Sequence, residues 1–187
     1  SIRASIMIAL PGPGKQRISS LIRWKSSERD VLFKKASQHL SEVKLTEEFF
    51  PKVGRDYQEL FDSTSSLSRL GSICNSSKTK FALYVPSAPR YFIPALKKSV
   101  RRSSQKTIYF DSAVDRDRAY MLINSSFMYW WWRVRDGGMT LSLETILSCP
   151  LVEFKLSESL IRRLEESETK NKVYKQNAGA AQENVKH

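Results

Sequence analysis

The sequence predicts an α+β fold, and three observations support this prediction. Two runs rich in β-forming residues, 2–10 and 17–25, are separated by prolines and glycines that favour a turn. Short strand-like segments punctuated by prolines follow in the middle of the chain. The second half contains a charge-free apolar stretch and a charged amphipathic stretch, both with helical spacing. We therefore expect an N-terminal β-hairpin, then a small mixed domain of strands and helices, and a C-terminal helix.

The first two runs predict an antiparallel hairpin. Run 2–10 is apolar almost throughout, which is typical of a strand covered on both faces, whereas run 17–25 alternates and suits an edge strand. A hairpin alone is too small to support a domain. We therefore expect it to belong to a larger sheet whose other strands precede residue 1, so that the chain is a piece of a longer protein.

The elements expected in the first part of the remaining chain are short. Residues 27–45 predict a helical connector, and the three- and four-residue spacing of apolar residues predicts a helix over 53–70 that Gly71 stops. The strands expected next are 80–85, 90–94 and 106–111.

The elements expected in the last part centre on a helix over 119–132. Asp111 or Ser112 can cap its start, and Gly137 and Gly138 end it. The elements expected after it are a strand at 139–141, a helical turn beginning near Ser142, a strand at 151–154 and a helix over 157–176. The tail, 177–187, lacks an apolar anchor, and we expect it to be disordered.

The composition points to a polyanionic partner inside the cell. The chain has 31 Lys and Arg against 19 Asp and Glu, a formal net charge of +12, which favours nucleic acid over an acidic protein or a small ligand. Its two cysteines have no metal or disulfide spacing and suit a reducing, cytoplasmic setting. The apolar run 119–132 is shorter than the roughly 20 residues of a membrane-spanning helix, so we expect no membrane partner.

A basic cluster supplies the candidate binding residues. Tyr91 is an aromatic side chain among its cations, and a surface of this density suits phosphates. The alternative is a solvated loop that only keeps the protein soluble. The candidate nucleic-acid-binding residues are Arg90, Tyr91, Lys97, Lys98, Arg101, Arg102, Lys106, Arg116 and Arg118.

Three consecutive tryptophans, Trp130, Trp131 and Trp132, close the apolar run. Successive helical residues turn by about 100 degrees, so at least one of these rings is expected to point away from the core. An exposed ring could stack on an unpaired base. Packing in the interior is the favoured interpretation, because indole burial removes so much apolar area from water.

The sequence offers no catalytic residue and no metal site. His39 and His187 lack partners for nucleophilic chemistry or metal binding, and the segment 10–15, LPGPGK, lacks the spacing of a phosphate-binding loop. Asp111, Asp115 and Asp117 alternate with arginines at a helix start, where carboxylates interact favourably with the helix dipole. We expect them to be structural.

Taken together, three segments resemble the C-terminal end of N6-adenine DNA methyltransferases of restriction-modification systems, including the TaqI-like members. The segments are the hairpin, the strand pair over 80–96 and the stretch from Leu122 to Phe154. The last carries most of the resemblance, through a helix of the form LxNSxxxYWxW followed by a CPL segment. Its matching residues are Leu122, Asn124, Ser125, Tyr129, Trp130, Trp132, Cys149, Pro150 and Leu151.

The resemblance implies a two-part chain. Residues 1–43 would hold the last strands of a Rossmann-like catalytic sheet plus a connector, residues 44–176 would be a DNA target-recognition domain, and 177–187 a disordered tail. The family binds S-adenosylmethionine and flips adenine into a site with a Pro-Pro-Tyr motif. This chain has no Pro-Pro pair and no glycine pattern for the cofactor, so we expect no cofactor and no methylation without a catalytic domain upstream in the same chain.

Two rival hypotheses remain. The chain could be a basic interaction module that binds RNA, single-stranded nucleic acid or a protein partner and has no methyltransferase activity. It could also be a self-contained enzyme, although the shortage of histidines and of paired nucleophile and base argues against this. The partner that the resemblance favours is double-stranded DNA.

Overall fold

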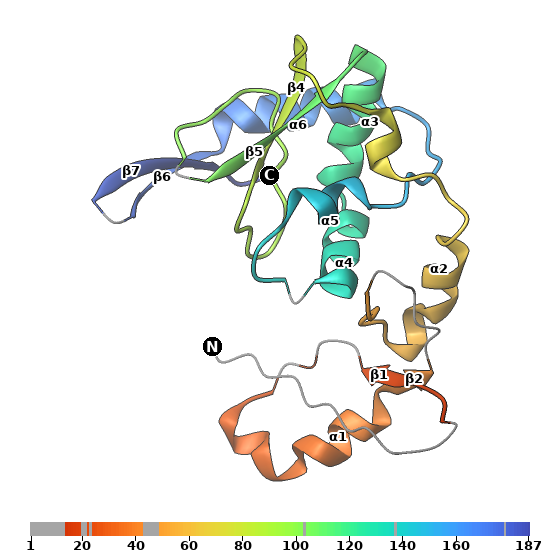
Figure 1. Ribbon diagram of the computed structural model, residues 1–187. Helices are drawn as coiled ribbons and strands as arrows, with labels where there is room; N and C mark the ends of the chain where they lie inside the picture. The colour runs from red at the N-terminus through yellow and green to blue at the C-terminus, as the bar shows by residue number, and fades with distance from the viewer. Residues whose placement is uncertain are drawn as a thin grey trace. The chain divides into compact units, whose positions relative to one another are not determined.

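The computed structural model of the chain describes residues 14–19, 22, 24–42, 49–102, 104–136, 138–177 and 179–187. The chain divides into two compact units, Ser1–Asp56 and Tyr57–His187. Helices and small antiparallel sheets coexist, so the predicted α+β class is confirmed (Figure 1). The predicted strand over 2–10 and the predicted boundary near residue 44 both lie outside the described residues.

The first unit is built around a two-stranded sheet. Strand β1 (Arg17–Ser19) pairs antiparallel with β2 (Leu40–Glu42), and the 3-10 helix η1 (Ser26–Val31) and helix α1 (Leu32–Gln38) lie between them in the chain. The predicted helical connector is therefore correct up to Gln38 but wrong over 40–42. Tertiary contacts explain the difference, because the buried Ser41 hydroxyl donates to the carbonyl of Val53 at 2.9 Å.

The second unit contains a three-stranded antiparallel sheet in the order β3-β5-β4. Its strands are β3 (Cys74–Asn75), β4 (Phe81–Pro86) and β5 (Gln105–Phe110). The predictions of strands at 80–85 and 106–111 are confirmed. The predicted strand at 90–94 does not form, because Pro89 and Pro94 have no N–H to donate to a ladder; this segment is part of a long loop that meets β4 at a single bridge, Tyr84–Leu96.

The helix predicted over 53–70 is much shorter in the structure. A 3-10 turn, η2 (Arg55–Tyr57), leads into α2 (Gln58–Ser63). The hydroxyls of Ser63 and Thr64 donate to carbonyls three residues back, a local bond that competes with helix continuation. Gly71 does not stop α2 but lies in the 3-10 helix η3 (Leu70–Ile73), where a Cβ would meet the Leu147 carbonyl oxygen at 3.3 Å.

The apolar helix expected over 119–132 is two helices, α3 (Ala113–Ile123) and α4 (Ser126–Arg135). Ser112 caps α3 by accepting from the Asp115 amide, which confirms one of the two predicted caps. Ser125 caps α4 by accepting from the Met128 amide. Apolar periodicity does not reveal this break, because apolar residues continue on both sides of it.

The remaining elements are α5 (Leu143–Leu147), α6 (Glu158–Lys170), β6 (Lys172–Asn177) and β7 (Ala180–Val185). Helix α5 begins after Ser142 as predicted, whereas the predicted strands at 139–141 and 151–154 do not form. The last helix ends at Lys170, and the tail predicted to be disordered contains β7, which pairs with β6. The reason is Val185, which is 2% exposed and packs against Leu96 and Val100.

The core of the second unit lies where α3 packs against β4 and β5 and where α4 contacts α3 and α5. Its largest fully buried side chains include Trp132, Tyr120 and Phe110. Helix α6 also contacts α3. These contacts hold both ends of the long β4–β5 loop, which carries most of the predicted binding residues.

Candidate nucleic-acid interface

The loop between β4 and β5, residues 87–104, is called the basic loop below. Three of its apolar side chains are buried: Ile93 is 2% exposed, Leu96 1% and Val100 8%. Tyr84 and Leu96 exchange two backbone hydrogen bonds of 2.8 and 2.9 Å. The described part of the loop is therefore anchored at these positions, and the polar residues between them are attached to a packed backbone.

Asn124, at the break between α3 and α4, clamps the middle of the basic loop. Its amide nitrogen donates to the Ala95 carbonyl at 3.1 Å, and its amide oxygen accepts from the Ala95 N–H at 3.1 Å. The same amide nitrogen donates to the Tyr120 carbonyl at 2.9 Å. The Asn124 side chain thus bonds both the N–H and the carbonyl of Ala95, as the backbone of a paired strand does.

Four of the predicted binding residues are exposed on the basic loop: Arg90, Tyr91, Lys98 and Arg101. Tyr91 has 76% of its surface accessible, and its backbone neighbour Arg90 is held by the Tyr129 hydroxyl, which donates to the Arg90 carbonyl at 3.2 Å. In the part of the chain that the structure describes, the side chains of Arg90, Lys98 and Arg101 have no ion-pair partner. These three cations are available to an external anion.

Lys97 is engaged in the interior instead. Its ammonium lies 2.7 Å from Asp117 and 2.5 Å from Glu165, and it sits 5.1 Å from the centroid of the Tyr120 ring. Only 12% of its side chain is exposed. Lys97 is neutralised within the fold and joins the basic loop to α3 and α6.

Glu168 completes this network from α6. It is 6% exposed, and its carboxylate accepts from the Tyr120 hydroxyl at 2.6 Å and from the Lys97 backbone N–H at 2.8 Å. Burial, followed by the hydrogen bond to Glu168, raises the pKa of Tyr120. The tyrosine therefore stays protonated and keeps donating.

Three further predicted residues also have partners within the fold. Arg102 donates to the Asn184 side chain at 2.5 Å, Lys106 donates to the Ser87 hydroxyl at 2.8 Å, and Arg116 pairs with Asp117 at 2.9 Å. Burial lowers the pKa of both Arg102 and Lys106. Their primary role in this structure is to hold the loop and the adjoining strand in place.

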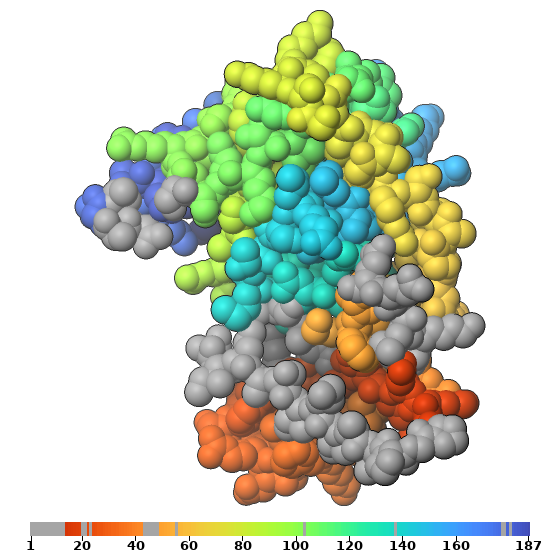
Figure 2. Space-filling view, in the orientation of Figure 1, coloured from red at the N-terminus to blue at the C-terminus, as the bar shows by residue number. Residues whose placement is uncertain are grey.

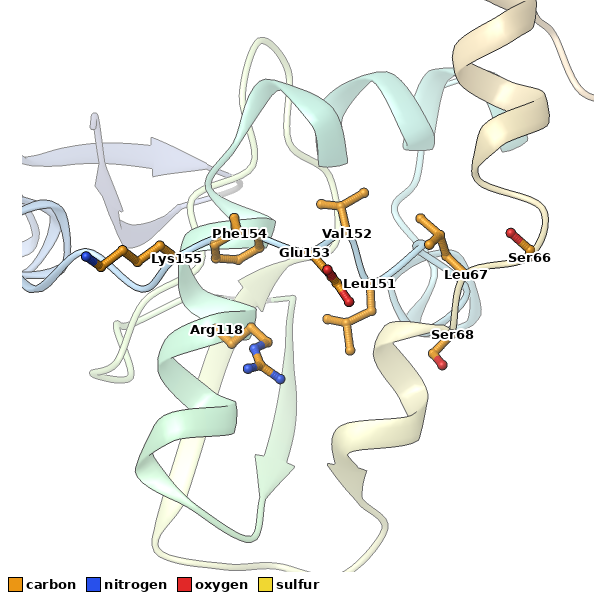
Figure 3. Close-up of a pocket in the computed structure, with 9 residues that line it drawn as sticks. All are labelled: Ser66, Leu67, Ser68, Arg118, Leu151, Val152, Glu153, Phe154 and Lys155. Atoms are coloured by element: carbon orange, nitrogen blue, oxygen red, sulfur yellow. The ribbon is translucent and has the colours of Figure 1, made fainter.

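Arg118 lies at a different place, on the wall of a cavity of about 730 Å³. Figure 3 shows its side chain extending from α3 toward the chain segment that contains Leu151. The remaining lining residues come from two extended segments: Ser66, Leu67, Ser68, Leu151, Val152, Glu153, Phe154 and Lys155. The charged lining residues are two cations, Arg118 and Lys155, and one acid, Glu153, so the cavity is not a purely basic site.

The tryptophans pack in the protein rather than forming an open platform. Trp131 and Trp132 are 2% and 0% exposed. Trp131 stacks on Phe61 at 6.2 Å between ring centroids. Trp130 is half-buried, as expected for one ring turned from the core, and has Phe127 at 5.4 Å and Tyr57 at 6.4 Å. The favoured interpretation of the tryptophan run is supported.

The three aspartates expected to be structural have local partners. Asp115 accepts from the Ser112 hydroxyl at 2.7 Å, and Asp111 accepts from Asn75 at 2.5 Å. Burial acts to raise the pKa of Asp117, but hydrogen bonds from Arg116 and Lys97 outweigh it, so the pKa lies below its ordinary value. Among the described residues, no group of three His, Cys, Asp or Glu side chains could hold a metal ion.

The sequence reasoning missed one exposed basic element, the C-terminal hairpin of β6 and β7. Its residues Lys172 and Lys175 are exposed, and Tyr174 has 68% of its surface accessible. The signal was present: Val173 and Tyr174 favour strands, and Gly179, with φ of 78 degrees, favours a turn. The hairpin was missed because the helix predicted over 157–176 was extended into its first strand.

Within the described part of the chain, no helix has the length and apolar character needed to cross a membrane. Comparison of the chain with protein-family models, curated proteins and solved structures gives no match.

Proposed function

We propose that the unit 57–187 binds double-stranded DNA through the basic loop, as the target-recognition part of an adenine-N6 DNA methyltransferase. One observation carries the DNA-binding proposal: Arg90, Lys98 and Arg101 are exposed, without an ion pair among the described residues, on a loop that is anchored by the buried side chains of Ile93, Leu96 and Val100. An anchored loop loses little conformational entropy on binding, so its charges are available at low cost.

The three exposed cations suit phosphate contacts. Each phosphate that is neutralised releases condensed counterions, which contributes about 0.9 to the slope of log affinity against log salt. Contacts to phosphates would fix the register of the protein on the duplex, while a few further side chains would read base edges. Tyr91, at 76% exposure, is the aromatic side chain that this proposal places against sugar or base.

The packing of the tryptophans favours a duplex over a single strand. Nonspecific binding of single strands uses aromatic side chains on which successive bases stack. Trp131 and Trp132 are buried, and Trp130 is half-buried among Phe127 and Tyr57. A duplex needs no such platform, because its bases are already stacked and its phosphates lie outside.

The methyltransferase part of the proposal rests on the resemblance described above. The Asn-Ser pair of that motif has a physical role here, since Asn124 clamps the basic loop and Ser125 caps α4. The residues of this chain do not fit S-adenosylmethionine, as the sequence has neither the Pro-Pro-Tyr motif nor a glycine pattern for it. We therefore assign cofactor binding and methyl transfer to a catalytic domain upstream in the same chain.

A cytoplasmic location follows from this proposal. The partner is DNA, and both Cys74 and Cys149 are unpaired thiols, which suits a reducing compartment.

The DNA-binding proposal is tested with two double variants of the full chain that remove equal charge. Lys98→Ala/Arg101→Ala removes two exposed cations of the basic loop, and Lys78→Ala/Lys80→Ala removes two from the β3–β4 turn. Binding of a fluorescent duplex is measured by anisotropy at several salt concentrations. We expect the loop variant to lower the salt slope by about two and the turn variant to leave it nearly unchanged.

The rival module that binds single strands makes a different prediction. Tyr91 and Phe92 are adjacent, 76% and 37% exposed, and could together stack on unpaired bases. Tighter binding to the single strand than to its duplex, lost in Tyr91→Ala, would support the rival and contradict the proposal. Equal effects of the two charge variants would show that the basic loop is only a solvated surface.

A further inference from the structure

The C-terminal hairpin forms a separate ribbon beside the sheet of the second unit. Strands β6 and β7 pair with each other over six residues, from Lys172↔Val185 to Asn177↔Ala180, and form a two-stranded sheet of their own. Figure 1 shows the ribbon projecting from the helices and the three-stranded sheet, and Figure 2 shows it beside the light green surface of the basic loop.

The base of this ribbon is fixed to the basic loop. Val185, 2% exposed, packs against Leu96 and Val100. The Glu183 backbone N–H donates to the Arg101 carbonyl at 2.8 Å, and Arg102 donates to the Asn184 side chain at 2.5 Å. The loop and the ribbon therefore belong to one surface, and Arg102 has the role of joining them.

The ribbon carries exposed and basic residues from its base to its tip. Lys172 is exposed at the base, opposite Val185, and Lys175 and Gln176 are exposed nearer the tip, as is Tyr174 at 68%. The side chains of the two lysines have no ion pair among the described residues. The acid of the described hairpin, Glu183, already accepts from the Arg101 backbone N–H at 3.3 Å. With Lys98 and Arg101, the ribbon extends one positive surface.

We propose that the C-terminal ribbon enters the major groove of the duplex that the basic loop holds; this inference rests on the proposed DNA binding. The major groove of B-form DNA is about 12 Å wide and admits a two-stranded ribbon. Six residues of strand span about 20 Å, so the outer half can reach into a groove about 8.5 Å deep while the base stays on the protein.

Side chains along β6 alternate between the two faces of the ribbon and therefore make different contacts in this proposal. Lys172, Tyr174 and Gln176 share one face of the ribbon, and Lys175 lies on the other. In this proposal Lys172, at the base of the ribbon, meets a phosphate at the rim of the groove, and Lys175 meets one on its wall. Gln176, close to the tip, presents a carboxamide that can both donate to and accept from the edge of an adenine. The major groove of A-form RNA is too narrow for such a ribbon, so the proposal commits to DNA.

The first test compares three double variants of the full chain in duplex binding by anisotropy across a salt series. Lys172→Ala/Lys175→Ala changes the ribbon, Lys98→Ala/Arg101→Ala changes the loop, and Lys78→Ala/Lys80→Ala is the control. The control turn adjoins the Phe81–Phe110 end of the sheet, whereas the ribbon bonds to Arg101 and Arg102, which precede Gln105 at the other end. Thermal unfolding confirms that all three variants fold.

We expect the ribbon variant to lose about two units of salt slope and roughly tenfold or more in affinity at 0.1 M salt, because each phosphate contact contributes about 0.9 to the slope. The control should bind as the unchanged protein does. A ribbon variant that binds like the control, beside a loop variant that binds weakly, would overturn the ribbon and leave the proposed function standing. Failure of the unchanged protein to bind duplex would overturn both.

The second test asks whether the ribbon reads bases. The unchanged protein and Gln176→Ala each select duplexes from a random pool, and the bound fractions are sequenced. We expect a preference at one or more positions for the unchanged protein, and its loss at an adenine for Gln176→Ala at nearly equal total affinity. Identical preferences in both proteins would overturn the base-reading role of the ribbon tip.

Discussion

At the scale of the residue, Lys97 and Lys98 are adjacent lysines with opposite environments. Lys97 faces Asp117 and Glu165 with 12% of its side chain exposed, whereas Lys98 is exposed and unpaired among the described residues. The orientation of each side chain is set by Leu96 and Val100, which are buried on either side of the pair. Charge at one position stabilises the fold, and charge at the other is available for a ligand.

Replacing each lysine by alanine should separate these two roles. Lys97→Ala leaves Asp117 without one of its cations and should cost about 1–3 kcal/mol of unfolding free energy, the range for a lost charged hydrogen bond. Lys98→Ala should stay within about 0.5 kcal/mol of the unchanged protein while weakening DNA binding. Urea unfolding measures the first effect and anisotropy the second. Equal stability of both variants would contradict the assignment of Lys97 to the interior.

Asp117 gives the fold an acid-sensitive contact. Its folded-state pKa lies below the ordinary value of 3.8, so the aspartate contributes stability that is present above about pH 4 and is lost as the pH falls through the folded-state value. Asp117→Asn should therefore flatten the stability profile below about pH 4. The measurement is urea unfolding between pH 2 and pH 6, and an unchanged acid limb would contradict the pairing with Arg116 and Lys97.

At the scale of the element, the break between α3 and α4 positions the basic loop. Asn124 lies at this break, and its side-chain amide bonds both the N–H and the carbonyl of Ala95. Ser125, next along, caps α4. The two residues between α3 and α4 thus link these helices to the basic loop, which carries the exposed cations.

Asn124→Ala should remove this clamp. The variant leaves the buried backbone N–H of Ala95 without its acceptor, at a cost of about 1–3 kcal/mol. Hydrogen exchange should show loss of protection at the Ala95 amide in this variant. Ser125→Ala is the control, since it removes the cap, about 1 kcal/mol, and the bond from its hydroxyl to the Leu122 carbonyl but no bond to Ala95, and should leave Ala95 protected. Equal protection of Ala95 in Asn124→Ala and the unchanged protein would refute the clamp.

At the scale of the whole molecule, the sequence predicted those helices and strands whose formation depends on residues close together in the chain. Strands β4 and β5, the Ser112 cap, α5 and most of α6 are confirmed, because strand propensity, capping and helical spacing are properties of neighbouring residues. The strand at Leu40–Glu42 and the C-terminal hairpin were missed, because they depend on partners far along the chain, such as Val53 for Ser41 and Leu96 for Val185. The early end of α2 was missed because the local bonds of the Ser63 and Thr64 hydroxyls leave the apolar spacing unchanged.

The candidate interface was predictable as a segment but not residue by residue. Charge density located 90–118, yet only contacts show that Lys97, Arg102, Lys106 and Arg116 have partners in the fold while Arg90, Lys98 and Arg101 stay exposed. The basic surface also extends to Lys172 and Lys175, about 70 residues further along the chain. A pattern within a short stretch of sequence cannot show that the basic loop and these two lysines lie on one surface.

The salt dependence of duplex binding by the full, unchanged chain tests the central claim most directly. Three cations of the basic loop and two of the ribbon, each contributing about 0.9, predict a slope of log affinity against log salt near −4.5. A steep slope near this value, with weaker binding to the matching single strand, is the predicted result. A slope near zero, or no binding to duplex at low salt, would contradict the account.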